Sequence, residues 1–421
     1  MQVAKTAVGT ISRAVGFIDR QERDWKLTAA RNSLDRFYDQ MVFPFQSIYT
    51  VGLGANATQL GIVNGIGMGV GGLLAPFTGW FIDRIGARKI YLVGIGLFAL
   101  AYLIYGVAQS WTTIIVAMIV YWLGYNVAWP CCTVICANCL ANKDRATAMS
   151  LCESIAWGAM GMVGPVLGAF LVTTFGGISV SGVRPLFFIS LGGTVLTFLL
   201  MFTKLSNHRW GRLGEAKGGI LNFFKDMSQI FEQGRNLKRW TVIYSATYLP
   251  YGMVLPFTYV FAHKVKGAEE YTLGLMVSGM ALTSLVFGVM AGRLADRIGR
   301  KNVLLLIAPL FYAANLLLIW APGDGFLVAS GVLLGFFIVS LSIAGAVTAE
   351  LVPPDQMGRW QGVLFLVIGL VTASGALLAG TIWDSIGPAY LFLIVTAVDL
   401  FIRIPLLMGM PETLGLQMRT E

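Results

Sequence analysis

Charged and amide side chains cluster in the apolar stretch from residue 29 to residue 50, and their types suit the binding of protons and anions. A carboxylate can take up a proton, and a guanidinium can bind a carboxylate or a phosphate. At 100° per residue, most of these polar side chains fall in one arc of roughly 140°. The members of this arc are Arg31, Asn32, Asp35, Arg36, Asp39, Gln46 and Thr50. Charges at membrane depth rarely face lipid, so the arc is predicted to line a protected or watery substrate pathway.

The composition indicates a polytopic membrane protein. The chain has 421 residues, of which 56% are hydrophobic and 12% are charged, whereas about a quarter of a soluble domain is charged. Apolar segments of about 20 residues, the length that spans a bilayer, recur along the whole chain. We expect twelve membrane-spanning helices, at residues 27–54, 60–82, 90–108, 113–140, 148–175, 184–203, 240–262, 272–295, 303–320, 326–351, 358–383 and 389–410.

A long basic connection between the sixth and seventh expected helices divides the chain into two halves. The predicted parts are a cytoplasmic segment 1–26, an N-terminal six-helix bundle 27–203, a cytoplasmic linker 204–239, a C-terminal six-helix bundle 240–410 and a cytoplasmic tail 411–421. Most of the 30 Lys and Arg residues lie in segments on the same side of the membrane as the N-terminus. The positive-inside rule therefore places both termini in the cytoplasm and the chain in the cytoplasmic membrane. Because the net charge of +9 alternates with the spans and forms no single patch, it gives no reason to expect a nucleic-acid partner.

Two loop sequences repeat at matching places in the halves. GWFIDRIGARK (Gly79–Lys89) begins 35 residues after Pro44, and GRLADRIGRKN (Gly292–Asn302) begins 36 residues after Pro256. The pair resembles the loop signature of the major facilitator superfamily. The resemblance implies an all-α membrane protein whose twelve transmembrane helices form two six-helix bundles related by pseudo-two-fold symmetry. It also implies a role in conformational gating for Gly79, Asp83, Arg84, Gly86, Arg88, Gly292, Asp296, Arg297, Gly299 and Arg300.

The chemistry of these loops suits such a role. An Asp at a helix end can hold the positive N-terminus of a neighbouring helix, which is the part expected of Asp83 and Asp296. An adjacent Arg can bridge to a carboxylate, which is the part expected of Arg84 and Arg297. The alternative is that these residues only anchor a tight glycine turn on the cytoplasmic side.

The motif Asn32-x2-Asp35-Arg36 is similar to the pattern that opens the anion:cation symporter and spinster branches of that family. The resemblance implies that Arg36 binds an anionic substrate group and that Asp35 carries a proton. An ionised Asp35 beside Arg36 would neutralise it, and protonation would free Arg36 for a carboxylate or phosphate. Asp39 is a second candidate for the proton, and a structural ion-pair cluster with Arg31 is the alternative.

The fourth expected helix departs from those branches. They place an Arg or a Glu near the cavity, where this chain has Val120, Asn126 and Val127. The usual second member of a proton relay is therefore missing.

Aromatic and amide side chains are expected to form much of the cavity wall. Tyr244, Tyr248 and Tyr251 recur at i, i+4 and i+7 on the seventh helix, and tyrosines offer both a hydroxyl and a π face. Packing in the helix core is the alternative for each of them. The predicted substrate-binding set is Arg36, Asp39, Gln40, Tyr125, Asn126, Trp129, Tyr248 and Tyr251, with Asp35 and Asp39 as proton-coupling residues.

The sequence predicts neither a metal site nor an enzyme. The five cysteines lie in or beside predicted helices without a neighbouring histidine, so they suit small apolar packing better than metal binding. The chain has no GxxxxGK[ST] phosphate loop and no nucleophile–base set. We therefore expect no cofactor and no coupling to ATP.

Together these features predict a proton-coupled secondary transporter, a monomer in the lipid bilayer, that moves a small organic anion by alternating access. A proton-driven exporter of amphipathic or drug-like compounds is the alternative. The glycines between Gly158 and Gly168, together with Pro165, resemble a motif of antiporters, although they also suit ordinary helix packing. In an exporter, the carboxylates would bind protons or cations and Arg36 would be structural. A receptor on the same fold is a third reading, for which the chain offers no sensor domain.

Overall fold

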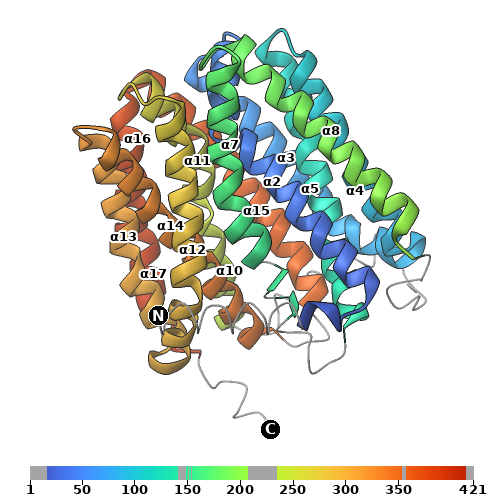
Figure 1. Cartoon of the computed structure of the whole chain (residues 1–421). Coiled ribbons are helices and arrows are strands. Elements are labelled where there is room, and N and C mark those ends of the chain that lie inside the picture. The colour runs from blue at the N-terminus through green and yellow to red at the C-terminus, as the bar shows by residue number, and fades with distance from the viewer. Residues whose placement is uncertain are drawn as a thin grey trace, which may run out of the picture.

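The structure is a computed structural model that describes residues 17–140, 148–149, 151–152, 154–206, 235–352 and 357–413. All regular secondary structure in these ranges is helical. Parts of the predicted N-terminal segment, linker and tail lie outside the described residues, so the domain boundaries stay predictions. The first and the last described residues lie at the same end of the molecule, called here the termini-side end (Figure 1). The opposite end is called the far end.

The helices fall into two bundles that follow the two halves of the sequence (Figure 1). The N-terminal half contains α2 (Arg23–Gly52), α3 (Ala57–Ile85), α4 (Ala87–Val107), α5 (Trp111–Cys139), η1 (Ser154–Met160), α7 (Gly161–Thr174) and α8 (Val180–Lys204). The C-terminal half contains α10 (Arg235–Thr247), α11 (Leu249–Lys264), α12 (Glu270–Ile298), α13 (Arg300–Trp320), α14 (Asp324–Leu351), α15 (Met357–Ser385), α16 (Pro388–Val398), η2 (Asp399–Arg403) and α17 (Ile404–Met408). Helix is present at all twelve expected places.

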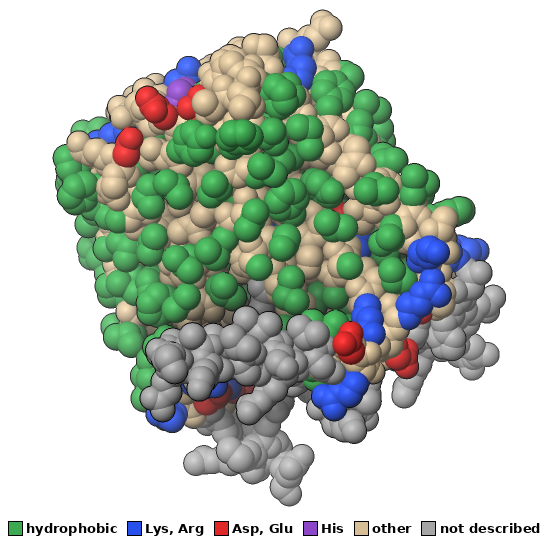
Figure 2. All heavy atoms as spheres, in the orientation of Figure 1, with side chains coloured by type: hydrophobic (Ala, Val, Ile, Leu, Met, Phe, Trp, Pro, Cys, Tyr) green, Lys and Arg blue, Asp and Glu red, His purple; other side chains and the backbone are tan. Residues whose placement is uncertain are grey.

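The surface of the bundles suits a bilayer. Ten helical segments of the described chain are long and apolar enough to cross a membrane. Large apolar side chains such as Leu196, Leu306 and Phe401 are exposed. On the face shown in Figure 2 they form a belt, and charged side chains gather at the two ends of the molecule. This is the distribution expected of a protein whose apolar surface faces lipid.

The first helix of each half is not among those ten membrane-spanning segments, and the reason differs between the halves. Helix α2 carries the charged arc, and the seventh expected helix is divided into α10 and α11 at Tyr248. Pro250 lies at the start of α11 and has no N–H with which to continue the hydrogen bonding of α10. The expectation of one unbroken helix over 240–262 was therefore wrong.

Helix α2 lies at the centre of the N-terminal half, where it packs against α5, η1, α7 and α8. Glycines of α7 allow a close approach. A Cβ atom at Gly168 would lie 2.2 Å from the carbonyl oxygen of Met41, and one at Gly164 would lie 2.8 Å from that of Phe37. This glycine row therefore serves helix packing, as the simpler interpretation of the motif proposed.

The two halves touch along α3 and α15 and along α7 and α12. At the far end, the Asp384 carboxylate accepts hydrogen bonds from the backbone nitrogen and the hydroxyl of Thr58, at 2.8 and 2.7 Å. At the same end, the Glu270 carboxylate accepts one from the backbone nitrogen of Ile178 at 3.1 Å. The halves are thus held together at the far end.

The predicted internal repeat is visible in the backbone. Gly86 joins α3 to α4 with φ +95°, and Gly299 joins α12 to α13 with φ +102°. Residues with a side chain rarely adopt such angles, so both copies of the loop need glycine at this point.

Candidate functional site

Two pockets follow one another along α2. The central pocket has an empty volume of about 860 Å³ and lies between the halves, with walls from α2, α3, α5 and η1 on one side and α11, α12 and α14 on the other. The termini-side pocket, of about 530 Å³, is lined by α2, α4, α5 and α8 of the N-terminal half alone. Four residues line both pockets: Arg36, Asp39, Tyr121 and Tyr125.

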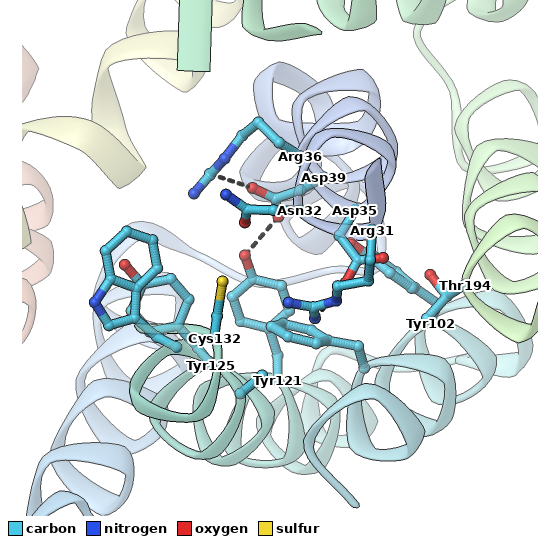
Figure 3. A pocket seen from close by; sticks show the side chains of 13 residues that line it. Arg31, Asn32, Asp35, Arg36, Asp39, Tyr102, Tyr121, Tyr125, Cys132 and Thr194 are labelled. Atoms are coloured by element: carbon cyan, nitrogen blue, oxygen red, sulfur yellow. Dashed lines mark hydrogen bonds and ion pairs between the residues drawn. The ribbon is translucent and has the colours of Figure 1, made fainter. Parts of the chain in front are cut away.

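An ion pair and a hydrogen bond connect three of these shared residues (Figure 3). The Nη1 atom of Arg36 lies 2.9 Å from Oδ2 of Asp39, one turn further along α2. The hydroxyl of Tyr121, on α5, donates to the other carboxylate oxygen of Asp39 at 2.5 Å. Asp39 is therefore held from two helices at the layer where the pockets meet.

The guanidinium of Arg36 also lies on an aromatic face. Its Cζ atom is 3.4 Å from the ring centroid of Trp157, a contact that contributes about 0.5–2 kcal/mol in proteins. Trp157 belongs to η1, a π-helical turn. The extra residue in a π-turn changes which face the following side chains present, so regular helical periodicity could not have placed this residue.

A second ion pair lies in the termini-side pocket. Arg31, whose side chain is 4% exposed, pairs with Asp35, and its Nη1 atom donates to the hydroxyl of Tyr91 at 3.2 Å. The Asp35 Oδ1 atom is buried and has no hydrogen-bond partner among the described residues. Asn32, on the same turn, donates to Cys152 at 3.6 Å.

This pairing corrects the expectation that Asp35 neutralises Arg36. Adjacent residues on a helix point about 100° apart, whereas residues three or four positions apart lie on the same face. Arg31 therefore pairs with Asp35, and Arg36 pairs with Asp39.

Most of the predicted substrate-binding residues line the two pockets. Gln40 and Tyr251 line the central pocket, Trp129 lines the termini-side pocket, and Tyr125 lines both.

Asn126 and Tyr248 are not among the lining residues. The Asn126 amide donates to the backbone oxygen of Trp122 at 2.9 Å. The Tyr248 ring packs between Tyr244 and Tyr251, with centroids 5.5 and 6.0 Å away.

In the second of the two repeated loops (Gly292–Asn302), which we call the second gating loop, Arg300 bridges the carboxylates of Asp296 and Glu350. It pairs with Asp296, and its Nε atom lies 3.1 Å from Glu350 on α14. Arg297, the residue expected to make this bridge, is exposed. The role expected of Arg297 therefore stays a prediction. Nothing lies within 4 Å of a Cβ atom built at Gly292.

In the first gating loop (Gly79–Lys89), Arg88 donates to the backbone oxygen of Phe202 at 2.7 Å, and Arg84 is exposed. The side chains at Gly79 and Asp83 lie outside the described residues. The proposed role of Asp83 in holding a helix N-terminus therefore stays a prediction.

The cysteines are buried and form no disulfide among the described residues. No group of three His, Cys, Asp or Glu side chains in that part of the chain is arranged to hold a metal ion.

Comparison with known proteins gives a family. The model described as Major Facilitator Superfamily matches residues 32–271 and 241–413. Multidrug resistance protein 2 of Bacillus subtilis is 23% identical over 331 residues, which cover 74% of this chain and 76% of that protein. The Cis,cis-muconate transport protein of Acinetobacter baylyi is 24% identical over 255 residues, 58% of each chain. Four further curated relatives are 30 to 35% identical, but the chain matches only 18 to 25% of their length.

The fold also matches solved structures. The crystal structure of the nucleoside transporter NupG aligns with a TM-score of 0.73 at 15% identity, covering 92% of this chain and 99% of that one. At this identity the match supports the shared fold.

Proposed function

As a member of the major facilitator superfamily, this chain is a membrane transporter and not an enzyme, and we propose that it moves a small organic anion by proton-coupled alternating access. The transporter works as a single chain, with both termini in the cytoplasm and the far end facing outward. The contacts of Asp384 and Glu270 at the far end support an arrangement that is closed to the outside.

The Arg36–Asp39 pair carries the proposal. While Asp39 is ionised, it neutralises the one arginine that both pockets share. Protonation of Asp39 removes this competing carboxylate, and the guanidinium becomes free to bind the carboxylate or phosphate of a substrate. Proton binding and anion binding then favour each other, and linkage requires the coupling to be reciprocal. Asp39 takes the part that the sequence motif suggested for Asp35.

The proposal is tested with Arg36→Gln, a neutral residue of similar length. Thermal stabilisation of the purified protein by a panel of organic carboxylates and phosphates reports binding, because a ligand of the folded state raises the melting temperature. We expect anions to stabilise the unmodified protein and not Arg36→Gln. Arg36→Lys is the matched variant: it keeps the charge but loses the planar donor fork, and it should bind more weakly than the unmodified protein. Unchanged anion affinity in Arg36→Gln would exclude the proposal.

An exporter of amphipathic compounds is the second candidate. The many aromatic and methionine side chains of the central pocket favour it, as does the similarity to Multidrug resistance protein 2 over most of both chains. For an exporter, lipophilic cations would stabilise the protein, the effect would survive Arg36→Gln, and it would be lost in Asp39→Asn.

A further inference from the structure

We propose that the central pocket takes a planar aromatic monocarboxylate with a hydroxyl group at the end remote from the carboxylate. This inference rests on the proposed anion transport and names the class of substrate. Three observations support it: the charge of the pocket, the aromatic side chains that form its walls, and the hydrogen-bonding groups that lie away from Arg36.

The charge of the pocket admits one carboxylate. Of the described residues that line it, Arg36 is the only cation and Asp39 the only anion. Once Asp39 is protonated, the lining has one positive charge. A monocarboxylate balances it, whereas the second carboxylate of a diacid would be buried without a partner, at a large cost in free energy.

The walls suit a flat apolar body. Seven aromatic side chains from α2, α5, η1 and α11 line the pocket: Phe43, Tyr121, Trp122, Tyr125, Trp157, Tyr251 and Tyr259. Several of them pack edge to face, such as Phe43 against Tyr259, with ring centroids 5.5 Å apart. An aromatic substrate can join such an arrangement, because rings prefer edge-to-face and offset contacts with one another.

The part of the pocket away from Arg36 offers hydrogen bonds of both kinds. Gln46 lies ten positions beyond Arg36 on α2, which is about 15 Å along the helix axis. Its amide nitrogen already donates to the hydroxyl of Tyr105 at 2.6 Å, and that of Asn64 donates to the backbone oxygen of Leu60 at 2.9 Å. Their carbonyl oxygens therefore provide acceptors for a donor on the substrate.

Trp122 supplies the complementary donor. Its Nε1 atom is buried and has no hydrogen-bond partner among the residues that the structure describes. Trp122 belongs to the same region as Gln46. Met118 contacts Gln46 through its sulfur at 3.9 Å, and a Cβ atom at Gly67 would touch both Met118 and Trp122. A hydroxyl can donate to an amide oxygen and accept from an indole N–H at the same time.

Four probes of related shape separate these features: cinnamate, 4-hydroxycinnamate, the dianion 4-carboxycinnamate and the flexible aliphatic acid hexanoate. Cinnamyl alcohol is the neutral control. Their affinities for the purified full-length protein are measured by calorimetry in mildly acidic buffer. We expect cinnamate to bind at least about tenfold tighter than 4-carboxycinnamate or hexanoate, a difference of about 1.4 kcal/mol.

The hydroxyl of 4-hydroxycinnamate should improve binding further. That gain should disappear in Trp122→Phe and in Gln46→Leu, while both variants still bind cinnamate. Retained cinnamate binding also shows that these variants are folded. If the hydroxyl brings no gain in the unmodified protein, the assignment of Gln46, Asn64 and Trp122 is overturned.

The outcomes distinguish this inference from the proposed function. If 4-carboxycinnamate or hexanoate binds as tightly as cinnamate, and Arg36→Gln abolishes that binding, the substrate class is wrong and anion transport stands. If no probe binds in an Arg36-dependent way and lipophilic cations bind instead, both proposals are overturned.

Discussion

Arg36 and Asp39 bind each other across one turn of α2, with 2.9 Å between Nη1 and Oδ2, at the layer shared by the two pockets. Tyr121 and Tyr125 are the other two residues that line both pockets. The second carboxylate oxygen of Asp39 accepts from Tyr121 at 2.5 Å. In the proposed mechanism, protonation of this carboxyl group makes Arg36 available to an anion.

Replacing Asp39 by Asn should separate anion transport from the proton gradient. Without a titrating group beside Arg36, anion binding should no longer depend on pH, and counterflow of labelled anion in proteoliposomes should continue. Accumulation driven by a pH gradient should be lost. The comparison is made with the unmodified protein under the same gradient.

Asp35→Asn is the matched control, because Asp35 pairs with Arg31 instead of Arg36. Anion binding in this variant should keep its dependence on pH. If Asp35→Asn loses that dependence while Asp39→Asn retains it, the two carboxylates have been assigned in the wrong order.

Replacing Trp157 by Leu should weaken anion binding without removing any charge. The indole face holds the guanidinium of Arg36, and losing a contact of about 0.5–2 kcal/mol corresponds to about a two- to thirtyfold rise in the Kd. Trp383→Leu is the control, because Trp383 packs against Phe257 and Phe261 and lines neither pocket. An equal loss of affinity in both variants would argue against a specific role for Trp157.

Gly168→Ala should destabilise the N-terminal half. The added Cβ atom would lie 2.2 Å from the carbonyl oxygen of Met41, and overpacking of this kind costs about 1–3 kcal/mol. Gly288→Ala, where nothing lies within 4 Å of the new atom, should be neutral or stabilising, because alanine favours helix. Melting temperatures in detergent measure both, and equal values would refute the close packing of α7 on α2.

Asp384→Ala and Glu270→Ala should weaken the closure at the far end. Spin labels at the exposed positions Thr112 and Asp324, placed in a cysteine-free background, would report the distance between the halves. We expect longer distances to become more populated in each variant and most in the double variant. Glu269→Ala, which removes the carboxylate next to Glu270, should leave the distances unchanged. An unchanged distribution in the double variant would show that these contacts do not hold the halves together.

Arg300→Gln should impair transport more than Arg297→Gln. Arg300 bridges Asp296 and Glu350, whereas Arg297 is exposed. Initial rates of uptake in proteoliposomes at equal protein content provide the comparison. A larger defect in Arg297→Gln would mean that the bridge shown here is not the one that matters during transport.

The architecture and the general place of the site follow from the sequence because their signals are strong. Twenty-residue apolar segments, the repeated loop and the polar arc of the first helix depend only on composition and period. The ion-pair partners of the individual charged residues do not follow from the sequence. The polar arc groups Asp35 with Arg36, but the side chains of adjacent helical residues point in different directions. The break before Pro250 could have been predicted from proline chemistry. Trp157 could not, because its position depends on a π-turn that leaves no clear signal in the sequence.

The contacts at the far end have a consequence for how the protein can vary. In both of them the C-terminal half supplies a carboxylate, Asp384 or Glu270, and the N-terminal half supplies a backbone N–H, at Thr58 or Ile178; at Thr58 the side-chain hydroxyl donates as well. Almost any substitution at Thr58 or Ile178 keeps that N–H, since only proline lacks it. Substitution at Ile178 therefore keeps its contact, whereas a change at Thr58 to any residue other than serine removes the hydroxyl bond to Asp384. A change at either acid removes its whole contact. Substitutions that alter the opening rate of this transporter should accordingly be found at Asp384, Glu270 and Thr58 more often than at Ile178.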